Sequence, residues 1–506
     1  MTTATAAQVH VLTPGTHADG QEQTVAAFLA ETFAAIDGPA LFLRSGKVGQ
    51  LVGEPGSRHF EAITRDQMRI FVEQFIYPYR IVKIPKQSRK QEPGTQPIYS
   101  SLTPDHGALL LAAAREHAYR LDSISPFPQL LNTAAFSPPG LTDGHFYDEP
   151  DALKDILIEA AALTVERACE NLNNLLVDFP FQDRAADFQN YLGLLLTPLV
   201  RPSIRGPVPM HLISAPRHGV GKSLLVSQVL GITVTGEPLS TLQLGDNESE
   251  AEKRISTSVY EMCPILNLDN VPADLDSPAL AMLLTSDIYH GRMLGKTQSI
   301  RVPNRCMVVA TGNNIGASGE ITRRTVPIRL VQTQERQEKR TGFEHPNLTE
   351  FLTLTRTRHL ASLYRLILEW LASGRPLSTK PLGSFESWSS IVGGVLENVF
   401  YVHHLGNRDE WAEAADQEHT EWAAMVKVWS ELPIAHRTAT ELAEVAKAAG
   451  LFERIWGYAK SDRAAVTSFG RNLFKACGRM FNGHFIRYKQ SGNGKTYYLE
   501  GSGGSA

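Results

Sequence analysis

The stretch MHLISAPRHGVGKSLLVSQVL at residues 210–230 constrains the fold more than any other part of the chain. Residues 210–214 are an apolar run of strand length, and residues 215–221 form a loop with two glycines. Lys222 and Ser223 then open an apolar segment of helical spacing, which Gly231 is expected to close. A strand, a glycine loop and a helix in direct succession predict an α/β fold.

The loop also has the composition of a phosphate-binding site. Glycines let backbone N–H groups turn inward around phosphate oxygens, and the helix N-terminus adds partial positive charge. Lys222 can reach the terminal phosphates, and the Ser223 hydroxyl can ligate magnesium. The pattern G-x-x-x-x-G-K-[ST] is departed from only at Pro216, where glycine is usual. A glycine turn that binds nothing is disfavoured, because the motif's strand and helix are both present. We predict that ATP is bound by Pro216, Arg217, His218, Gly219, Val220, Gly221, Lys222, Ser223 and Leu224.

Two further strands end in residues that suit the same site. Residues 264–270, PILNLDN, form an apolar strand that ends in Asp269, where a P-loop ATPase holds magnesium through water. Residues 306–311 form another buried strand, and Asn313 just beyond it can orient the attacking water. The predicted cofactors are therefore ATP and Mg²⁺, with Ser223 and Asp269 as the metal-binding residues.

Basic residues follow at two places in the same region. Residues 292–294 and 299–302 flank a turn at 295–298, which predicts a β-hairpin with Lys296 near its tip. Arg292 and Lys296 could touch a nucleic-acid backbone, and an ordinary surface hairpin is the alternative. Arg323 and Arg324 precede another strand, where one of them could stabilise transition-state charge in a neighbouring subunit.

These motifs together resemble the AAA+ and superfamily 3 helicase-like ATPases of phages, plasmids and genomic islands. The resemblance rests on SAPRHGVGKS, ILNLDN, MLGKTQSIRVPN and VVATGNN followed by TRR, and it extends to SFESWSSIVGGVLE and HLGN. It is more distant in FLRSGKVGQLV and LTDGHFYDEP. The resemblance implies a ring, expected to be a hexamer, that uses ATP to move on or melt DNA, with Asn313 as the sensor 1 residue. The implied catalytic residues are Lys222, Asp269, Asn270, Asn313, Arg323 and Arg324.

One position departs from the family pattern. Many AAA+ proteins follow the aspartate with a glutamate that acts as the base, whereas this chain has Asn270. Asparagine can orient water but cannot accept its proton. Slow hydrolysis, or help from another carboxylate such as Glu252 or Asp274, would each be consistent with this change. The sequence leaves both open.

The chain on either side predicts further domains. The expected order is a flexible leader (1–22), an N-terminal α+β accessory domain (23–145), a helical linker region (146–205), the P-loop AAA+ ATPase core (206–340), a helical lid (341–412) and a C-terminal winged helix (413–500). Residues 501–506, GSGGSA, resemble an expression linker. Residues 86–97 form a charged loop that could be a nucleic-acid arm and is more typical of a solvated loop. Arg356, Arg358 and Arg365 in the lid are candidates for a sensor 2 role.

The C-terminal region predicts three helices and a two-stranded wing with a glycine-rich tip, which together favour a winged helix. Residues 461–500 hold seven Lys or Arg against Asp462 and Glu500, although the whole chain has a net charge of -4. This local excess is typical of phosphate contact, and subunit packing is the alternative. Duplex DNA is expected to contact Arg471, Lys475, Lys489 and Lys495.

Composition bears on the cellular compartment, on zinc binding and on membrane insertion. Four cysteines lie far apart without C-x-x-C spacing, which favours a reducing cytoplasm and argues against a zinc site. No apolar run is long enough for a membrane span. Together with what the family resemblance implies, we predict a cytoplasmic ATP-dependent DNA helicase or translocase of a mobile element or phage, acting as a homo-oligomer on a single strand in its pore. The alternative is a nucleotide-switched assembly or regulatory protein with little unwinding. A small-molecule kinase fits poorly, because it has no use for paired arginines or a basic terminal domain.

Overall fold

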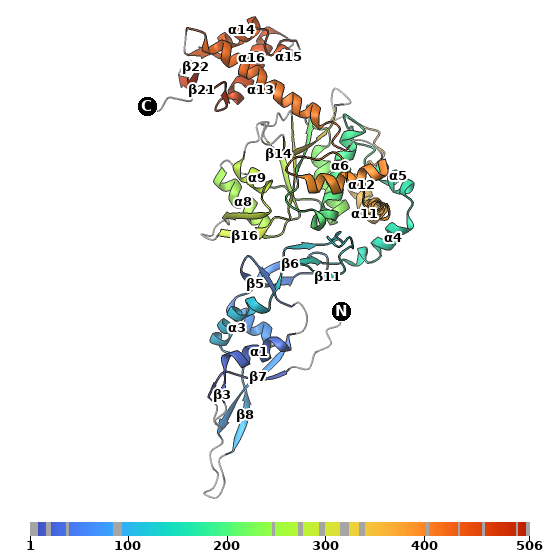
Figure 1. Cartoon of the computed structure of the whole chain (residues 1–506), viewed down its shortest axis with the longest axis vertical. Helices are drawn as coiled ribbons and strands as arrows, with labels where there is room; N and C mark the ends of the chain where they lie inside the picture. Colours follow the sequence, from blue (N-terminus) through green and yellow to red (C-terminus); the bar gives the residue numbers. More distant parts are fainter. Residues whose placement is uncertain are drawn as a thin grey trace.

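The computed structural model describes residues 9–16, 22–36, 40–83, 94–244, 248–271, 277–292, 299–313, 323–332, 340–400, 404–433, 436–457, 461–491 and 494–501. Figure 1 shows three parts along the long axis of the molecule: an N-terminal lobe, a central core and a C-terminal lobe. The N-terminal lobe, residues 9–120, lies at the lower end, and the C-terminal lobe, residues 437–501, lies at the upper end.

A parallel four-stranded sheet forms the centre of the core. Its strands are β13 (Met210–Ala215), β14 (Ile265–Val271), β17 (Met307–Asn313) and β18 (Thr325–Arg329), in the order β14-β17-β13-β18. All three pairings are parallel. The carboxyl ends of the strands therefore meet at one edge of the sheet, and their amino ends meet at the opposite edge.

Helices cover both faces of this sheet, because its side chains alternate between two apolar clusters. Ile213 and Val309 belong to one cluster, which includes residues of α6 (Ala186–Val200), α11 (Leu348–Ala372) and α12 (Glu386–Phe400). Leu212 and Val308 belong to the other, with α8 (Glu248–Tyr260), α9 (Pro278–Leu283), and the hairpin of β15 (Ile288–Arg292) and β16 (Ser299–Pro303). The predicted α/β class is confirmed at this level.

In the part that the structure describes, the N-terminal lobe contains three helices and two larger sheets. The helices are α1 (Val25–Ala35), α2 (Arg65–Val72) and α3 (Pro104–His117). One sheet orders β6 (His59–Ala62), β5 (Lys47–Val52), β4 (Phe42–Arg44) and β9 (Tyr119–Arg120). The other orders β1 (Val9–Leu12), β7 (Ile76–Lys83) and β8 (Thr95–Tyr99), and β2 (Gly15–Thr16) pairs with β3 (Glu22–Gln23).

Strand β1 lies inside the segment expected to be a flexible leader. It pairs in parallel with β7, and the Val11 side chain is fully buried. The VHVL alternation is too short to stand out from its polar surroundings, and its partner strand lies far along the chain. Residues 9–12 therefore form a strand because they pair with β7, although their local sequence alone does not predict one.

A shorter sheet and several helices join this lobe to the core. The sheet contains β10 (Ser123–Ser125), β12 (His145–Tyr147) and β11 (Gly140–Thr142). The first half of the expected helical linker region is divided into η1 (Asp151–Leu153), α4 (Ile156–Ala162) and α5 (Val165–Leu175). Thr164 ends the continuity, because its extended backbone and its side chain cap α5. The turn η2 (Arg201–Ser203) follows α6.

The C-terminal lobe follows a long helix. Helix α13 (Arg408–Ser430) passes without a break through residues 412–413, where the lid was expected to end and the winged helix to begin. It is followed by β19 (Arg437–Thr438), α14 (Ala439–Ala448), α15 (Glu453–Gly457), α16 (Asp462–Ala476), β20 (Met480–Phe481), β21 (His484–Ser491) and β22 (Gly494–Gly501). Gly501, assigned to the linker, pairs with His484.

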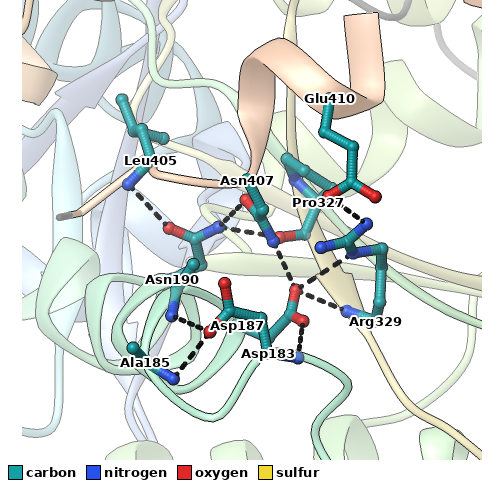
Figure 2. A network of polar contacts seen from close by, with 10 residues as sticks. Asp183, Ala185, Asp187, Asn190, Pro327, Arg329, Leu405, Asn407 and Glu410 are labelled. Carbon is teal, nitrogen blue, oxygen red and sulfur yellow. Dashed lines mark hydrogen bonds and ion pairs between the residues drawn. The ribbon is translucent and has the colours of Figure 1, made fainter. Parts of the chain in front are cut away.

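A buried polar network fixes the start of α13 to the core, as Figure 2 shows. Asp187 Oδ1 accepts hydrogen bonds from Arg329 N at 2.9 Å and Asn407 Nδ2 at 2.5 Å. Asn190 Nδ2 donates to Asn407 Oδ1 at 3.0 Å, and Arg329 Nη1 pairs with Glu410 at 3.0 Å. Burial raises the pKa of Asp187 to about 6, although backbone N–H donors oppose the shift. The network joins α6, β18 and α13.

Candidate nucleotide site at the carboxyl edge of the sheet

The glycine loop after β13 encloses a hollow of about 420 Å³. Gly219 and Gly221 have φ of 81° and 98°, a region that costs other residues steric strain. A Cβ atom on Gly221 would also lie 3.2 Å from the Phe179 ring. Helix α7 (Lys222–Leu224) begins at this point and continues as η3 (Leu225–Thr235). The strand, loop and helix predicted from the motif are thus confirmed.

The helix ends later than expected. Gly236, with φ of 93°, terminates η3, whereas Gly231 lies inside it. A Cβ atom on Gly231 would lie 2.6 Å from Glu237 O, so this glycine is needed for close packing rather than for termination.

Lys222 presents its charge inside the hollow. Its side chain is only 8% exposed, and its Nζ donates to Asn313 Oδ1 at 2.7 Å and to Arg217 O at 3.2 Å. Burial lowers the pKa of Lys222, and the nearby Asp269 carboxylate opposes this shift. The ammonium group therefore rests against two neutral oxygens, an arrangement that favours an incoming anion.

Asp269 joins the loop to the neighbouring strand. Its Oδ1 accepts hydrogen bonds from Ser223 Oγ at 2.9 Å and from Thr311 Oγ1. Thr311 Oγ1 accepts in turn from Asn270 N at 2.9 Å. A hydroxyl beside a carboxylate supplies oxygen ligands of the kind that Mg²⁺ prefers. Among the described residues, no group of three or more His, Cys, Asp or Glu is placed to hold a metal ion.

Asn313 lies between two polar side chains of the loop region. Its Oδ1 accepts the hydrogen bond from Lys222, and its Nδ2 lies 3.1 Å from His218 Nδ1. Asn270 also lines the hollow, and its φ of 54° places it in the left-handed region, which asparagine tolerates better than most residues. Thus Lys222, Ser223, Asp269, Asn270 and Asn313 come together from three segments of the chain.

A second hollow, of about 160 Å³, adjoins the first and shares Gly219, Gly221 and Leu224 with it. Its other lining residues are Asp178, Phe179, Val220, Arg340, Phe343, His345, Pro346 and Leu348. The Asp178 carboxylate accepts from Glu344 N and His345 N, both at 2.9 Å, and so fixes one wall. Val220 belongs to the predicted loop, whereas the other residues were missed in the sequence because they come from two separate segments, 178–179 and 340–348, that form no motif.

Arg323 and Arg324 lie at the opposite edge of the sheet. Arg324 O accepts from Met210 N at 3.0 Å, at the start of β13, whereas the glycine loop follows the end of that strand. Six strand residues at about 3.3 Å each separate the two edges by roughly 20 Å. The Arg323 side chain is exposed, and that of Arg324 is 9% exposed. Neither arginine lines the hollow of its own copy.

The sensor 2 candidates and the described candidate for an alternative catalytic base also lie outside the hollow. Arg356 donates to Val234 O at 3.2 Å, Arg365 pairs with Glu369 at 2.5 Å, and Arg358 is exposed. Glu252 lies near Tyr289 of the β15–β16 hairpin, where burial, helped by the negative charge of Glu252, raises the pKa of that tyrosine. None of these four lines the hollow, and Asp274 lies outside the described residues.

The predicted DNA-binding residues are exposed where the structure describes them. Arg292 ends β15, while Lys296 lies outside the described residues. Exposed basic side chains of the C-terminal lobe are Arg471 and Lys475 on α16, Lys489 on β21 and Lys495 on β22. Lys495 Nζ lies 3.6 Å from the centre of the Phe474 ring, so the hairpin and α16 meet at this surface.

Comparisons with known proteins give matches only in structure. No protein-family model matches the chain, and no curated protein matches it in sequence. The A form apo structure of the NrS-1 C-terminal region superposes with a TM-score of 0.40 and 11% identity, covering 91% of this chain and 96% of that one. JCV helicase with a bound small molecule gives a TM-score of 0.25 and 13% identity, covering 54% and 73%. Among the described residues, no helix has the length and apolar character needed to cross a bilayer.

Proposed function

We propose that this protein hydrolyses ATP and uses the energy to move on or unwind DNA. The proposal rests on one observation: Lys222, Ser223, Asp269 and Asn313 line a single hollow beside the glycine loop. A cation, a hydroxyl, a carboxylate and an amide are the groups that phosphoryl transfer requires for positioning and charge stabilisation.

Each residue has a distinct role in this proposal. The loop N–H groups and Lys222 hold the phosphates, and Asn313 orients the attacking water. Ser223 and Asp269 would hold Mg²⁺, which neutralises phosphate charge when it is bound. The adjoining hollow, with Phe179 and Phe343 on its walls, would take the nucleotide base.

The arginine pair supports a site shared between copies. Arg323 and Arg324 lie at the edge of the sheet opposite the hollow, so they could act only on the nucleotide of a neighbouring copy. Arg323 is the better candidate because its side chain is exposed, whereas Arg324 is buried. A ring, which we propose to be a hexamer, would place each such pair against the next copy's hollow.

DNA contact is proposed at two places. The β15–β16 hairpin would touch a single strand through Arg292 and Lys296, and a winged helix formed by the C-terminal lobe would contact duplex through its basic residues. The exposure of Arg292, Arg471, Lys475 and Lys489 supports these roles. Such contacts should weaken as salt rises.

A forked-duplex unwinding assay tests the proposal. The wild-type protein should release a labelled strand only with ATP and magnesium. Lys296→Ala should retain basal ATP hydrolysis and lose unwinding, because it removes a proposed DNA contact and leaves the nucleotide hollow intact. Normal unwinding by that variant would rule out the hairpin role. Electron microscopy with a slowly hydrolysed ATP analogue and forked DNA would count the subunits.

A nucleotide-switched assembly protein is the second candidate, and Asn270 is the observation that favours it. An amide lines the hollow where a proton acceptor would be expected. A switch of this kind would form rings with ATP and release no strand in the same assay. Ring formation without unwinding would therefore select this second function.

A further inference from the structure

The N-terminal lobe exposes a group of aromatic rings that the proposed ATPase does not use. We define the aromatic platform as His10 on β1, Tyr77 and Tyr79 on β7, and Tyr99 on β8. Ring centroids lie 5.6 Å apart for His10 and Tyr77, 5.4 Å for His10 and Tyr99, and 5.7 Å for Tyr79 and Tyr99. These contacts place all four rings on one face of the β1-β7-β8 sheet.

The opposite face of the sheet explains why the platform faces outward. Val11 and Ile76 are almost fully buried in the core of the lobe, against helices α1, α2 and α3. Because strand residues alternate between faces, their neighbours His10 and Tyr77 must point away from that core. Tyr77 and Tyr99 remain 50% and 51% exposed, which is a large aromatic surface to leave in water.

The electrostatics of the sheet suit an anion. Its three strands contain Arg80 and Lys83 and no acidic residue. Lys83 is exposed and shares the face of Tyr77 by strand alternation. Glu73 lines an open hollow beside Tyr77 and Tyr99, and its carboxylate accepts a hydrogen bond from Leu102 N at 2.5 Å.

An open hollow of about 380 Å³ lies beside two of the rings, with Tyr77, Tyr99, Pro78 and Ser100 among its lining residues. The hydrogen bond between His10 Nδ1 and the Tyr99 hydroxyl, at 2.8 Å, holds one ring in place. Exposed rings beside an open hollow, with a lysine further along the same face of the sheet, are features by which proteins stack unpaired bases and hold the backbone.

We propose that the aromatic platform binds single-stranded nucleic acid, with bases stacked on Tyr77 and Tyr99 and the backbone near Lys83. This site lies at the end of the molecule opposite the C-terminal lobe (Figure 1). It would hold a strand far from the basic residues of that lobe. The proposal does not depend on nucleotide hydrolysis and is tested without nucleotide.

The test measures fluorescence anisotropy of a labelled oligothymidylate of ~12 nucleotides with the full chain. The series is made in a Lys475→Ala, Lys489→Ala background, so that phosphate contacts of the C-terminal lobe do not mask the platform. Tyr77→Ala and Tyr99→Ala should each weaken binding on the order of tenfold. The loss should persist as salt rises, because stacking depends little on counterion release.

Two matched variants control the experiment. Tyr77→Phe keeps the ring and should bind like its parent. Tyr119→Ala removes a tyrosine that is 49% exposed on β9, outside the platform, and should also bind normally. An oligonucleotide with 5-iodouracil, irradiated with the unmodified protein, should crosslink to the platform strands, and this readout requires no altered protein to fold.

Unchanged affinity in both alanine variants, with crosslinks mapped only outside β1, β7 and β8, would overturn the proposal. A platform that instead receives a protein strand along the edge of β8 would give that same result, because main-chain pairing does not require the rings. Failure here would leave the ATPase proposal intact, since that proposal is measured by hydrolysis and strand release.

Discussion

The two edges of the central sheet differ in what they hold and in how they hold it. The carboxyl edge gathers Lys222, Ser223, Asp269 and Asn313 around one hollow, with hydrogen bonds among them. The amino edge holds Arg323 and Arg324, and neither of them lines that hollow. One copy of the chain therefore has the proposed phosphate site at one edge and the candidate transition-state cation at the other. Under the proposed function, a complete site requires two copies.

Removing Lys222, the cation in the hollow at the carboxyl edge, should have the largest effect on ATP hydrolysis. Lys222→Ala deletes the buried ammonium group that would neutralise the terminal phosphates, so ATP hydrolysis should fall by at least ~10³-fold. Phosphate release under saturating ATP measures this loss. Lys427→Ala, which removes an exposed lysine of α13, should hydrolyse ATP normally. A Lys222→Ala protein that is folded and fully active would show that the hollow is not the site.

Removing the cation of the opposite edge should have the next largest effect. Arg323→Ala should lower hydrolysis about a thousandfold if it serves the neighbouring copy. Mixing it with Lys222→Ala should restore part of the activity, because some junctions then pair an intact hollow with an intact arginine. Arg324→Ala, mixed in the same way, identifies which arginine acts. Mixtures as inactive as their components would contradict a shared site.

Strand β18 connects the two edges, and the polar network of Figure 2 holds it to α13. Arg408 of α13 also donates to Arg323 O at 3.3 Å. Asp187→Ala leaves the Arg329 and Asn407 donors without their acceptor in a buried site, which should cost ~3 kcal/mol of unfolding free energy. Chemical denaturation of the wild type and the variant measures this cost.

The same network predicts a pH dependence. The pKa of Asp187 is about 6 in the folded chain, above its usual value of 3.8, so the folded state binds more protons between these values. The stabilisation from Asp187 is therefore greatest below pH 3.8 and declines as the pH rises through about 6. Asp187→Asn cannot titrate and should lack this decline. An identical slope in both proteins would assign the dependence to another group.

The second hollow, which we propose binds the nucleotide base and call the base hollow, should contribute less to ATP hydrolysis than the two cations. Phe343→Ala removes an aromatic wall over which the Arg340 guanidinium lies at 4.8 Å. The KM for ATP should rise about tenfold with little change in kcat, because the wall would contact the nucleotide equally before and during the reaction. Leu354→Ala, a highly exposed position on α11, is the matched control. A changed kcat with an unchanged KM would argue against a base site.

How far the sequence could predict this molecule depends on how local each signal is. The glycine loop, Asp269 and Asn313 were predicted because each lies at the end of a strand whose apolar run marks it. Strand β1 and the walls of the base hollow were missed, because long-range pairing and packing of separate segments define them. The boundary expected between residues 412 and 413 was wrong, because an acidic segment there is part of helix α13 rather than a linker. Lys296 and Asp274 stay predictions, as they lie outside the described residues.

Asn270 gives the smallest expected effect and the sharpest test of the carboxyl edge. Its φ of 54° lies in a region that costs glutamate on the order of 1 kcal/mol, so Asn270→Glu should be slightly less stable. The new carboxylate supplies a proton acceptor in the hollow and should raise ATP hydrolysis by up to about tenfold. Asn270→Gly relieves the backbone without adding a carboxylate, and it should match the wild-type rate. Equal rates in all three proteins would mean that proton acceptance at this position does not limit turnover, and the slow-switch function would lose its support.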